Sequence, residues 1–172
     1  LNVTKNRVYL FGGMQNSAYS NVIYSATLNS DGSIGSWTLT VYLPVTAGYH
    51  VTIITRNFVY LIGGVHNGSH SSNIYRANIY TDGTIGSWQL QPWTLPATLT
   101  YSNINICKNR IYVFGGMVSG GWSAACWTGD MFGGLNDYSS FYSNQIEQNY
   151  MTPGSGKPWQ QQYQINETQS TD

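Results

Sequence analysis

The chain has 172 residues, of which 41% are hydrophobic and 15% aromatic, so it contains enough apolar material for the core of one domain. Only 8% of the residues are charged, against about 25% in an average soluble protein, and seven basic residues balance seven acidic ones. This balance argues against nucleic acid and against docking on an anionic membrane. No stretch approaches the roughly 20 apolar residues of a membrane span, which argues against membrane insertion. The composition is typical of secreted all-β proteins, so we expect an extracellular location or one on a cell or particle surface.

Internal repeats dominate the sequence. Three segments match almost letter for letter, 51 and 52 residues apart: NRVYLFGG from Asn6, NFVYLIGG from Asn57 and NRIYVFGG from Asn109. A second landmark, SDGSIGSW ending at Trp37, returns as TDGTIGSW ending at Trp88. A Leu-Pro pair follows at 43–44 and again at 95–96. Three landmarks that share one period indicate a repeat protein.

Each repeat is predicted to form four β-strands. Residues 50–55 and 58–62 alternate in polarity around Arg56-Asn57, which predicts a hairpin. The Gly-Gly pair that ends it suits a place where backbones crowd or φ must be positive. A third strand near Tyr75 and a turn at Asp82-Gly83 then lead to a fourth strand at Trp88. Recurrence places the repeated aromatics in the core: Tyr9, Tyr60, Tyr112, Trp37, Trp88 and Trp159.

These landmarks, a Gly-Gly after an aromatic-rich strand, a Tyr about ten residues later, a Trp further on and a Leu-Pro before the next unit, resemble the kelch family. The resemblance covers nearly the whole chain and is closest to kelch-type repeats of secreted or surface-exposed microbial proteins. It implies a partial β-propeller of three four-stranded antiparallel blades, at 1–44, 45–96 and 97–172. The usual Arg-His before the first strand appears here only as Tyr49-His50 and Tyr101-Ser102.

Two alignments fit the third repeat. In the first, residues 142–146 match residues 19–23, and Trp159 then falls at the distance expected for the repeated Trp. This alignment predicts an inserted loop, 117–141, between the second and third strands, and loops of such length are usually functional or disordered. The alternative places Trp127 in the slot of the repeated Tyr. We favour the insertion because it also accounts for Trp159.

The predicted loop supplies the candidate binding residues, since its aromatics do not recur and flat rings with few competing charges suit stacking on a sugar or an apolar protein anchor. The candidates are Trp122, Trp127, Asp130, Phe132, Asp137, Tyr138 and Phe141. Asp130 and Asp137 would serve a glycosidase if held about 5–9 Å apart, whereas loop solvation is the simpler interpretation. Asp31 and Asp82 occupy the same turn in successive repeats, which indicates a structural role.

Three smaller features complete the set of candidates. Cys107 and Cys126 form either one disulfide or two separate thiols. Three triplets fit the N-glycosylation pattern, with Asn67 in the most loop-like context and Asn2 and Asn166 behind it. His66 and His70 lack a third ligand, and nothing matches the Cys, Tyr and His set of galactose oxidase, a copper enzyme with a kelch propeller, so we expect no metal and no cofactor.

The leading prediction is a binding or adhesion module that presents propeller loops to a glycan or protein partner, as in an adhesin or a fibre. The alternatives are a purely structural assembly subunit and a sugar-modifying propeller enzyme, and an enzyme is the less favoured. Three blades cannot close a ring, since propellers have about four to eight. Further blades, from the same longer chain or a second copy, are therefore expected partners.

Overall fold

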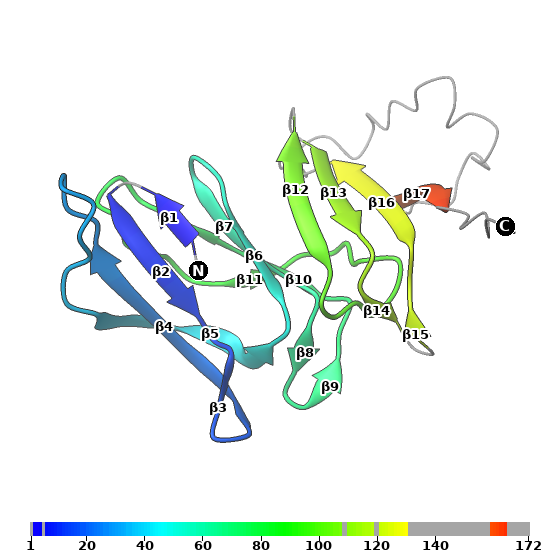
Figure 1. Ribbon diagram of the computed structural model, residues 1–172, viewed down its shortest axis with the longest axis horizontal. Helices are drawn as coiled ribbons and strands as arrows, with labels where there is room; N and C mark the ends of the chain where they lie inside the picture. Colours follow the sequence, from blue (N-terminus) through cyan, green and yellow to red (C-terminus); the bar gives the residue numbers. More distant parts are fainter. Residues whose placement is uncertain (1, 5, 108–109, 119–120, 131–158, 165–172) are drawn as a thin grey trace, which may run out of the picture. The chain divides into compact units, whose positions relative to one another are not determined.

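The computed structural model describes residues 2–4, 6–107, 110–118, 121–130 and 159–164 (Figure 1). Over these residues the chain is all-β, with antiparallel pairing throughout and no helix. The described residues accordingly contain no helix with the length and apolarity to span a membrane. The chain divides into two compact units, Leu1–Tyr101 and Ser102–Asp172. The all-β class that the repeats predict is confirmed.

The first unit contains two sheets, built from the first two repeats. Sheet 1 comprises β1 (Asn2–Thr4), β2 (Arg7–Phe11), β3 (Met14–Gln15), β4 (Ala18–Thr27), β5 (Thr38–Gly48), β8 (Val65–His66) and β9 (Ser69–His70). Sheet 2 comprises β6 (Val51–Ile54), β7 (Phe58–Ile62), β10 (Ile74–Asn78) and β11 (Gln89–Leu90). Four strands of each repeat lie side by side in chain order, β1-β2-β4-β5 and β6-β7-β10-β11.

The second unit contains the third repeat. Its main sheet has the order β12 (Asn103–Cys107), β13 (Arg110–Phe114), β16 (Ala125–Asp130) and β17 (Trp159–Gln164). A separate hairpin is formed by β14 (Met117–Val118) and β15 (Gly121–Trp122). Four antiparallel strands per repeat, in chain order, are therefore observed three times.

The third repeat does not follow the favoured alignment. β16 comes directly after the β14–β15 hairpin and pairs with β13 so that Trp127 lies opposite Val113. Tyr24 lies opposite Leu10 in the same register of the first repeat. Trp127 thus occupies the position of the repeated Tyr, as the alternative alignment has it. Residues 117–118, 121–122 and 125–130 form β-strands where the favoured alignment predicts the inserted loop 117–141.

The fourth strand of this repeat begins where the sequence predicts. Trp159 opens β17, and Gln160 lies opposite Thr128 in the register where Gln89 lies opposite Arg76. The additional length of the third repeat therefore connects its third and fourth strands. The residues of this connection, 131–158, lie outside the described part of the chain, and the third strand predicted at 142–146 lies among them.

The Gly-Gly pairs end the second strand of each repeat in a backbone conformation that glycine adopts without strain. All six of these glycines have positive φ, between +50° and +100°. The backbone is also crowded, because a Cβ on Gly12 would lie 2.7 Å from the carbonyl oxygen of Ala47, and one on Gly63 would lie 2.8 Å from that of Leu99. Both reasons for glycine that the sequence predicts are confirmed.

The Asp-Gly turns are closed by the Asp side chains. Ser33 donates hydrogen bonds of 2.9 and 2.7 Å from its backbone N–H and hydroxyl to Asp31, and Thr84 donates the same pair to Asp82 at 2.9 and 2.8 Å. These hydrogen bonds lower the pKa of both carboxyl groups. The glycine after each Asp has a φ of +83°. The structural role predicted for both Asp residues is confirmed.

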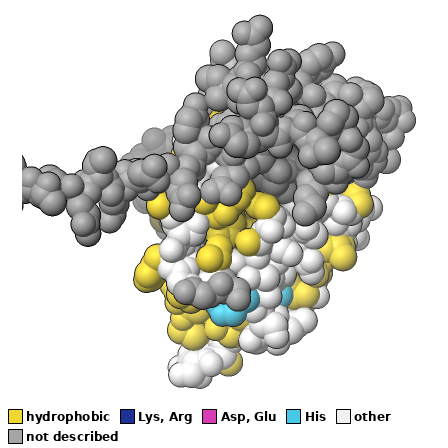
Figure 2. All heavy atoms as spheres, turned by 90° about the vertical axis from the view of Figure 1, so that its right-hand side faces the viewer, with side chains coloured by type: hydrophobic (Ala, Val, Ile, Leu, Met, Phe, Trp, Pro, Cys, Tyr) yellow, Lys and Arg dark blue, Asp and Glu magenta, His cyan; other side chains and the backbone are white. Residues whose placement is uncertain are grey.

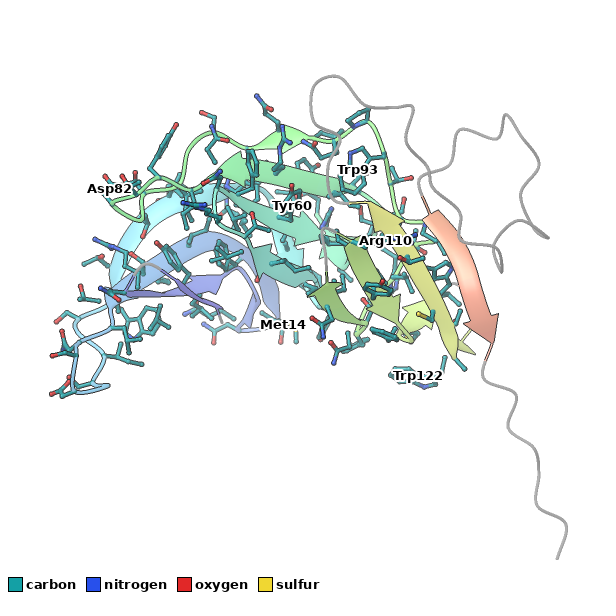
Figure 3. All side chains as sticks on the ribbon, turned by 90° about the horizontal axis from the view of Figure 1, so that it is seen from above. Met14, Tyr60, Asp82, Trp93, Arg110 and Trp122 are labelled. Atoms are coloured by element: carbon teal, nitrogen blue, oxygen red, sulfur yellow. The ribbon has the colours of Figure 1, made fainter. Side chains whose placement is uncertain are left out.

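Sheets 1 and 2 pack through one hydrophobic cluster. Its members, all less than a tenth exposed, are Tyr9, Phe11, Ile23, Leu43, Ala47, Val59, Leu61, Ala77, Ile79 and Ile85. The hydroxyl of Tyr9 donates a buried hydrogen bond of 2.6 Å to the carbonyl oxygen of Gly83. The second strand of the first repeat therefore holds the Asp-Gly turn of the second repeat, which Figure 3 shows around Asp82.

The repeated aromatics are not all in the core. Tyr9 and Tyr60 are fully buried, and Trp88 packs against the shared cluster, but Trp37 is 43% exposed, which corrects the expectation for that residue. The difference is the neighbouring sheet. Sheet 1 packs against the second repeat, which contains Trp88, whereas no second sheet of the first unit packs against Trp37. Tyr112 is half-buried. The side chain of Trp159 lies outside the described part of the structure.

Removing the Tyr9 hydroxyl is expected to cost about 1–3 kcal/mol of unfolding free energy, because Tyr9→Phe leaves the buried carbonyl of Gly83 without its donor. Tyr42→Phe, at a side chain that is 53% exposed, is expected to change stability by less than about 0.5 kcal/mol. Urea denaturation of both variants beside the unmodified protein measures the difference. Equal losses for the two variants would contradict the role assigned to this hydrogen bond.

Candidate functional site: a tyrosine cluster at the repeat connections

The candidate binding residues from the sequence are not gathered in one loop. Trp127 is only 7% exposed in β16, so its side chain belongs to the core of the third repeat rather than to an exposed loop. Trp122 is 77% exposed and points away from the strands in Figure 3, as a surface residue would. Asp130 ends β16 with its backbone opposite Arg110. The others lie outside the described residues: Phe132, Asp137, Tyr138 and Phe141.

The candidate disulfide is not formed. Cys126 is a free thiol, and burial raises its pKa. The register explains why, since Cys107 lies opposite Arg110 at one end of β13 and Cys126 lies opposite Phe114 at the other. The four-residue offset along the strand alone is about 13 Å. That exceeds the roughly 7 Å between Cα atoms that a disulfide bridges.

The glycosylation and histidine candidates fall on different parts of the chain. Asn67 lies exposed in the tight turn between β8 and β9, and its side-chain oxygen accepts hydrogen bonds from the backbone and hydroxyl of Thr46. Asn2 opens β1, and Asn166 lies outside the described residues. His66 is buried in β8 and His70 is exposed in β9. The described residues contain no group of three His, Cys, Asp or Glu that could hold a metal ion.

Three tyrosines meet where the chain passes from one repeat to the next. Tyr49 precedes β6, Tyr101 occupies the same position before the third repeat, 52 residues later, and Tyr19 lies near the start of β4. The ring centroids of Tyr49 and Tyr101 are 4.4 Å apart, and those of Tyr19 and Tyr49 are 6.0 Å apart at 80°. Tyr101 is 50% exposed and the other two are half-buried. We call these three residues the tyrosine cluster.

The backbone of this cluster is strained. Tyr49 and Tyr101 have φ values of +53° and +57°, a region that bulky side chains rarely adopt. Each such residue costs on the order of 1–3 kcal/mol, and such strain concentrates at functional sites. The backbone N–H of Tyr101 donates to the carbonyl oxygen of Tyr49 at 3.3 Å, so the two strained residues are in direct contact. Glycine would meet the same backbone requirement without strain, which points to a use for the aromatic rings.

Hydrogen bonds fix the exposed side of the cluster. The hydroxyl of Tyr49 donates to the sulfur of Met14 at 3.7 Å, and a hydrogen bond to Tyr49, with partial burial and the neighbouring tyrosines as further causes, raises the pKa of Tyr101. Met14 is itself 54% exposed. The β3–β4 turn next to it adds the exposed polar side chains of Gln15 and Asn16. The result is an uncharged surface with flat rings and short polar groups around them.

Two neutral histidines, His50 and His66, lie between Tyr49 and Tyr101 in the sequence. Burial lowers the pKa of His50 to about 4, with a smaller contribution from His66, and burial also lowers the pKa of His66. The ring of His66 lies 5.7 Å from that of Tyr75. On the face drawn in Figure 2, the coloured side chains of the described residues are hydrophobic or His, and none is charged. Both histidines therefore act as neutral aromatic groups at neutral pH.

No protein-family model matches this chain, and no curated protein matches it either. The site is therefore interpreted from its own geometry. Neutral rings held at fixed angles, with hydroxyl and amide groups nearby, can stack on the apolar face of a sugar ring and hydrogen-bond its hydroxyls. The described residues of the cluster offer no charged acid or base for a reaction, so the arrangement suits binding.

Sequence reasoning did not select the tyrosine cluster. Tyr49 and Tyr101 stood out only as departures from the Arg-His of the kelch pattern. Their recurrence at a spacing of 52 residues was a usable signal, because a bulky residue repeated at a connection rather than in a strand has no core to fill. Tyr19 carries no comparable signal, since its contact with Tyr49 depends on tertiary structure. A Cβ on Gly48 would lie 2.5 Å from the Tyr19 ring, so this contact also depends on the glycine.

Proposed function

We propose that the chain is part of a kelch-like β-propeller, exposed outside a cell or on a particle surface, and that it binds carbohydrate through the tyrosine cluster. The blades of the propeller are the four-stranded sheets of the three repeats. The chain acts as a binding or adhesion module and catalyses no reaction. The observation that carries the proposal is the pair of tyrosines, Tyr49 and Tyr101, whose rings are in contact and whose backbone is strained at the same position of two repeats.

Several observations support the propeller part of the proposal. Each repeat has the same strand order, and the registers of the third strand on the second agree in all three repeats. Sheet 1 packs on sheet 2 through the cluster that contains Tyr9 and Leu61, as neighbouring blades do. The low charge of the chain, 8%, and the connections that carry the cluster suit a surface module.

The binding proposal is tested by the double variant Tyr49→Gly/Tyr101→Gly. We expect it to lose glycan binding by roughly 30-fold or more, the loss typical of removing buried aromatic anchors, while the unfolding midpoint stays the same or rises because glycine relieves the strained φ. A glycan array identifies the bound sugars, and calorimetry with the best of them gives the affinity. Tyr49→Phe keeps the ring and is expected to retain binding within a few-fold.

Trp122→Gly is the matched control, because Trp122 is an exposed aromatic candidate outside the cluster. It is expected to leave glycan affinity unchanged. Loss of binding in this variant with no loss in the tyrosine variant would move the site to the third repeat. An array without any bound glycan would overturn the proposal in favour of the structural subunit.

A further inference from the structure

One face of sheet 1 is apolar and exposed. Leu10 and Tyr24 lie opposite each other on β2 and β4 and are 44% and 39% exposed. Ile34 and Trp37, which follow in the connection to β5, are 49% and 43% exposed. We call these four residues the open face. A contiguous exposed patch of large apolar side chains in a soluble protein marks an interaction surface.

The second repeat shows what such a face binds. The same four residue types recur 51 residues later as Leu61, Tyr75, Ile85 and Trp88. Leu61 is fully buried and Ile85 is 8% exposed, and the other two pack against the same cluster. Sheet 1 covers them with Tyr9 and Phe11. Identical side chains are therefore buried in one repeat and exposed in the other, and the difference is the neighbouring sheet.

The Asp-Gly turns show the same contrast. A Cβ on Gly83 would lie 2.7 Å from the hydroxyl of Tyr9 and 2.6 Å from the side chain of Arg7, so the turn of the second repeat is tightly held. A Cβ on Gly32, in the corresponding turn of the first repeat, has no neighbour within 4 Å. Arg7 also contributes to the lowered pKa of Asp82, after the hydrogen bonds from Thr84. Within the first unit, the Asp-Gly turn of the first repeat therefore has no Arg and Tyr packed against it, whereas Arg7 and Tyr9 pack against the turn of the second repeat.

The third repeat carries the matching side chains. Arg110, Tyr112 and Phe114 occupy the positions on β13 that Arg7, Tyr9 and Phe11 occupy on β2, whereas β7 of the second repeat has Phe58, Tyr60 and Ile62 there. The rings of Tyr112 and Phe114 stack with centroids 6.4 Å apart, as those of Tyr9 and Phe11 do at 5.9 Å. Phe114 is 46% exposed, while Phe11 is 4% exposed.

We propose that the open face binds β13 of a second copy of this chain, with Phe114 packed over Leu10 and Trp37. Tyr112 takes the place that Tyr9 has against Gly83 and donates to the carbonyl oxygen of Gly32. Arg110 lies beside Asp31, as Arg7 lies beside the Asp82-Gly83 turn of the second repeat. The interface therefore combines apolar packing with opposite charges, in the arrangement that the chain already uses between its first two repeats.

This contact joins two different surfaces, so it is a head-to-tail interface. Copies joined through this interface either close into a ring or extend into a chain of molecules. The inference does not depend on glycan binding, because no residue of the tyrosine cluster belongs to either surface.

The test uses the full chain and its mass in solution, measured by light scattering after gel filtration. The unmodified protein is expected to have at least twice the 19.1 kDa of one chain. Leu10→Glu and Phe114→Glu are each expected to weaken self-association by roughly 30-fold or more. Ile34→Glu, in the connection rather than in a strand, repeats the first test with less risk to the sheet. Leu90→Glu, at a side chain that is 55% exposed on β11, is the control and is expected to self-associate normally.

Mixing the two variants gives the decisive result. The Leu10→Glu copy retains a normal β13, and the Phe114→Glu copy retains a normal open face, so a mixture is expected to form a one-to-one dimer that neither variant forms alone. A single 19.1 kDa species of the unmodified protein at about 100 µM would overturn the proposal, as would a mixture that stays monomeric or a Leu90→Glu variant that dissociates. Circular dichroism confirms that each variant is folded.

Discussion

Gly64→Ala is expected to destabilise the first unit by about 3–5 kcal/mol, whereas Gly13→Ala at the equivalent position of the first repeat is expected to cost about 1–2 kcal/mol. Both glycines have positive φ, +88° and +100°, so the backbone penalty is similar. Their surroundings differ. A Cβ on Gly64 would lie 2.6 Å from the carbonyl oxygen of Gly48 and from the Cα of His50, while one on Gly13 has no neighbour within 4 Å.

The clash at Gly64 cannot be relieved by rotating a side chain, because the atoms involved are backbone. The backbone N–H of Gly64 also donates to the carbonyl oxygen of Leu99 at 2.6 Å, so the loop is fixed from a second side. Urea denaturation of both variants gives the two losses of unfolding free energy. Equal losses would show that positive φ alone explains the glycines at these positions and that backbone crowding at Gly64 does not contribute to the loss of unfolding free energy.

The strands and turns of the first two repeats were predictable because their signals are local. Alternating polarity, the Asp-Gly turn and the Gly-Gly pair each determine backbone geometry within a few residues, and each recurs with one period. The third repeat was harder to predict because Trp127 replaces the repeated Tyr. Residues 142–146 resemble residues 19–23 in sequence, but sequence similarity in a polar segment rich in Ser and Asn does not establish which strands pair. The register of β16 on β13 identifies β16 as the third strand of this repeat.

Burial was less predictable than secondary structure. Trp37 and Trp88 lie in nearly identical segments, yet one is exposed and the other packs against the core. The difference depends on the sheet next to each repeat, which a local pattern does not encode. The tyrosine cluster was missed for a related reason, since Tyr19 meets Tyr49 only after the connection between the repeats has folded. The strain at Tyr49 appears only in the backbone angle.

Lowering the pH from 7 to 4 is expected to destabilise the first unit by about 3 kcal/mol through His50 alone. Burial lowers the pKa of this histidine from 6.5 to about 4, so between these values the unfolded chain binds a proton that the folded chain does not. Stability is therefore complete above pH 6.5 and declines as the pH falls toward 4. The lowered pKa of His66 acts in the same direction. Unfolding midpoints in urea at a series of pH values measure the slope.

His50→Leu is expected to flatten this slope, because leucine fills a similar volume and does not titrate. The matched control is His70→Leu, at an exposed residue of β9, which is expected to keep the full slope. The two Asp carboxyl groups of the first unit do not contribute to the slope in this pH range. Asp31 and Asp82 have lowered pKa values, so the stability that they contribute is lost only below about pH 4, under the window where His50 acts. A slope between pH 6.5 and 4.5 that persists in His50→Leu would mean that His66 or another group carries the acid sensitivity.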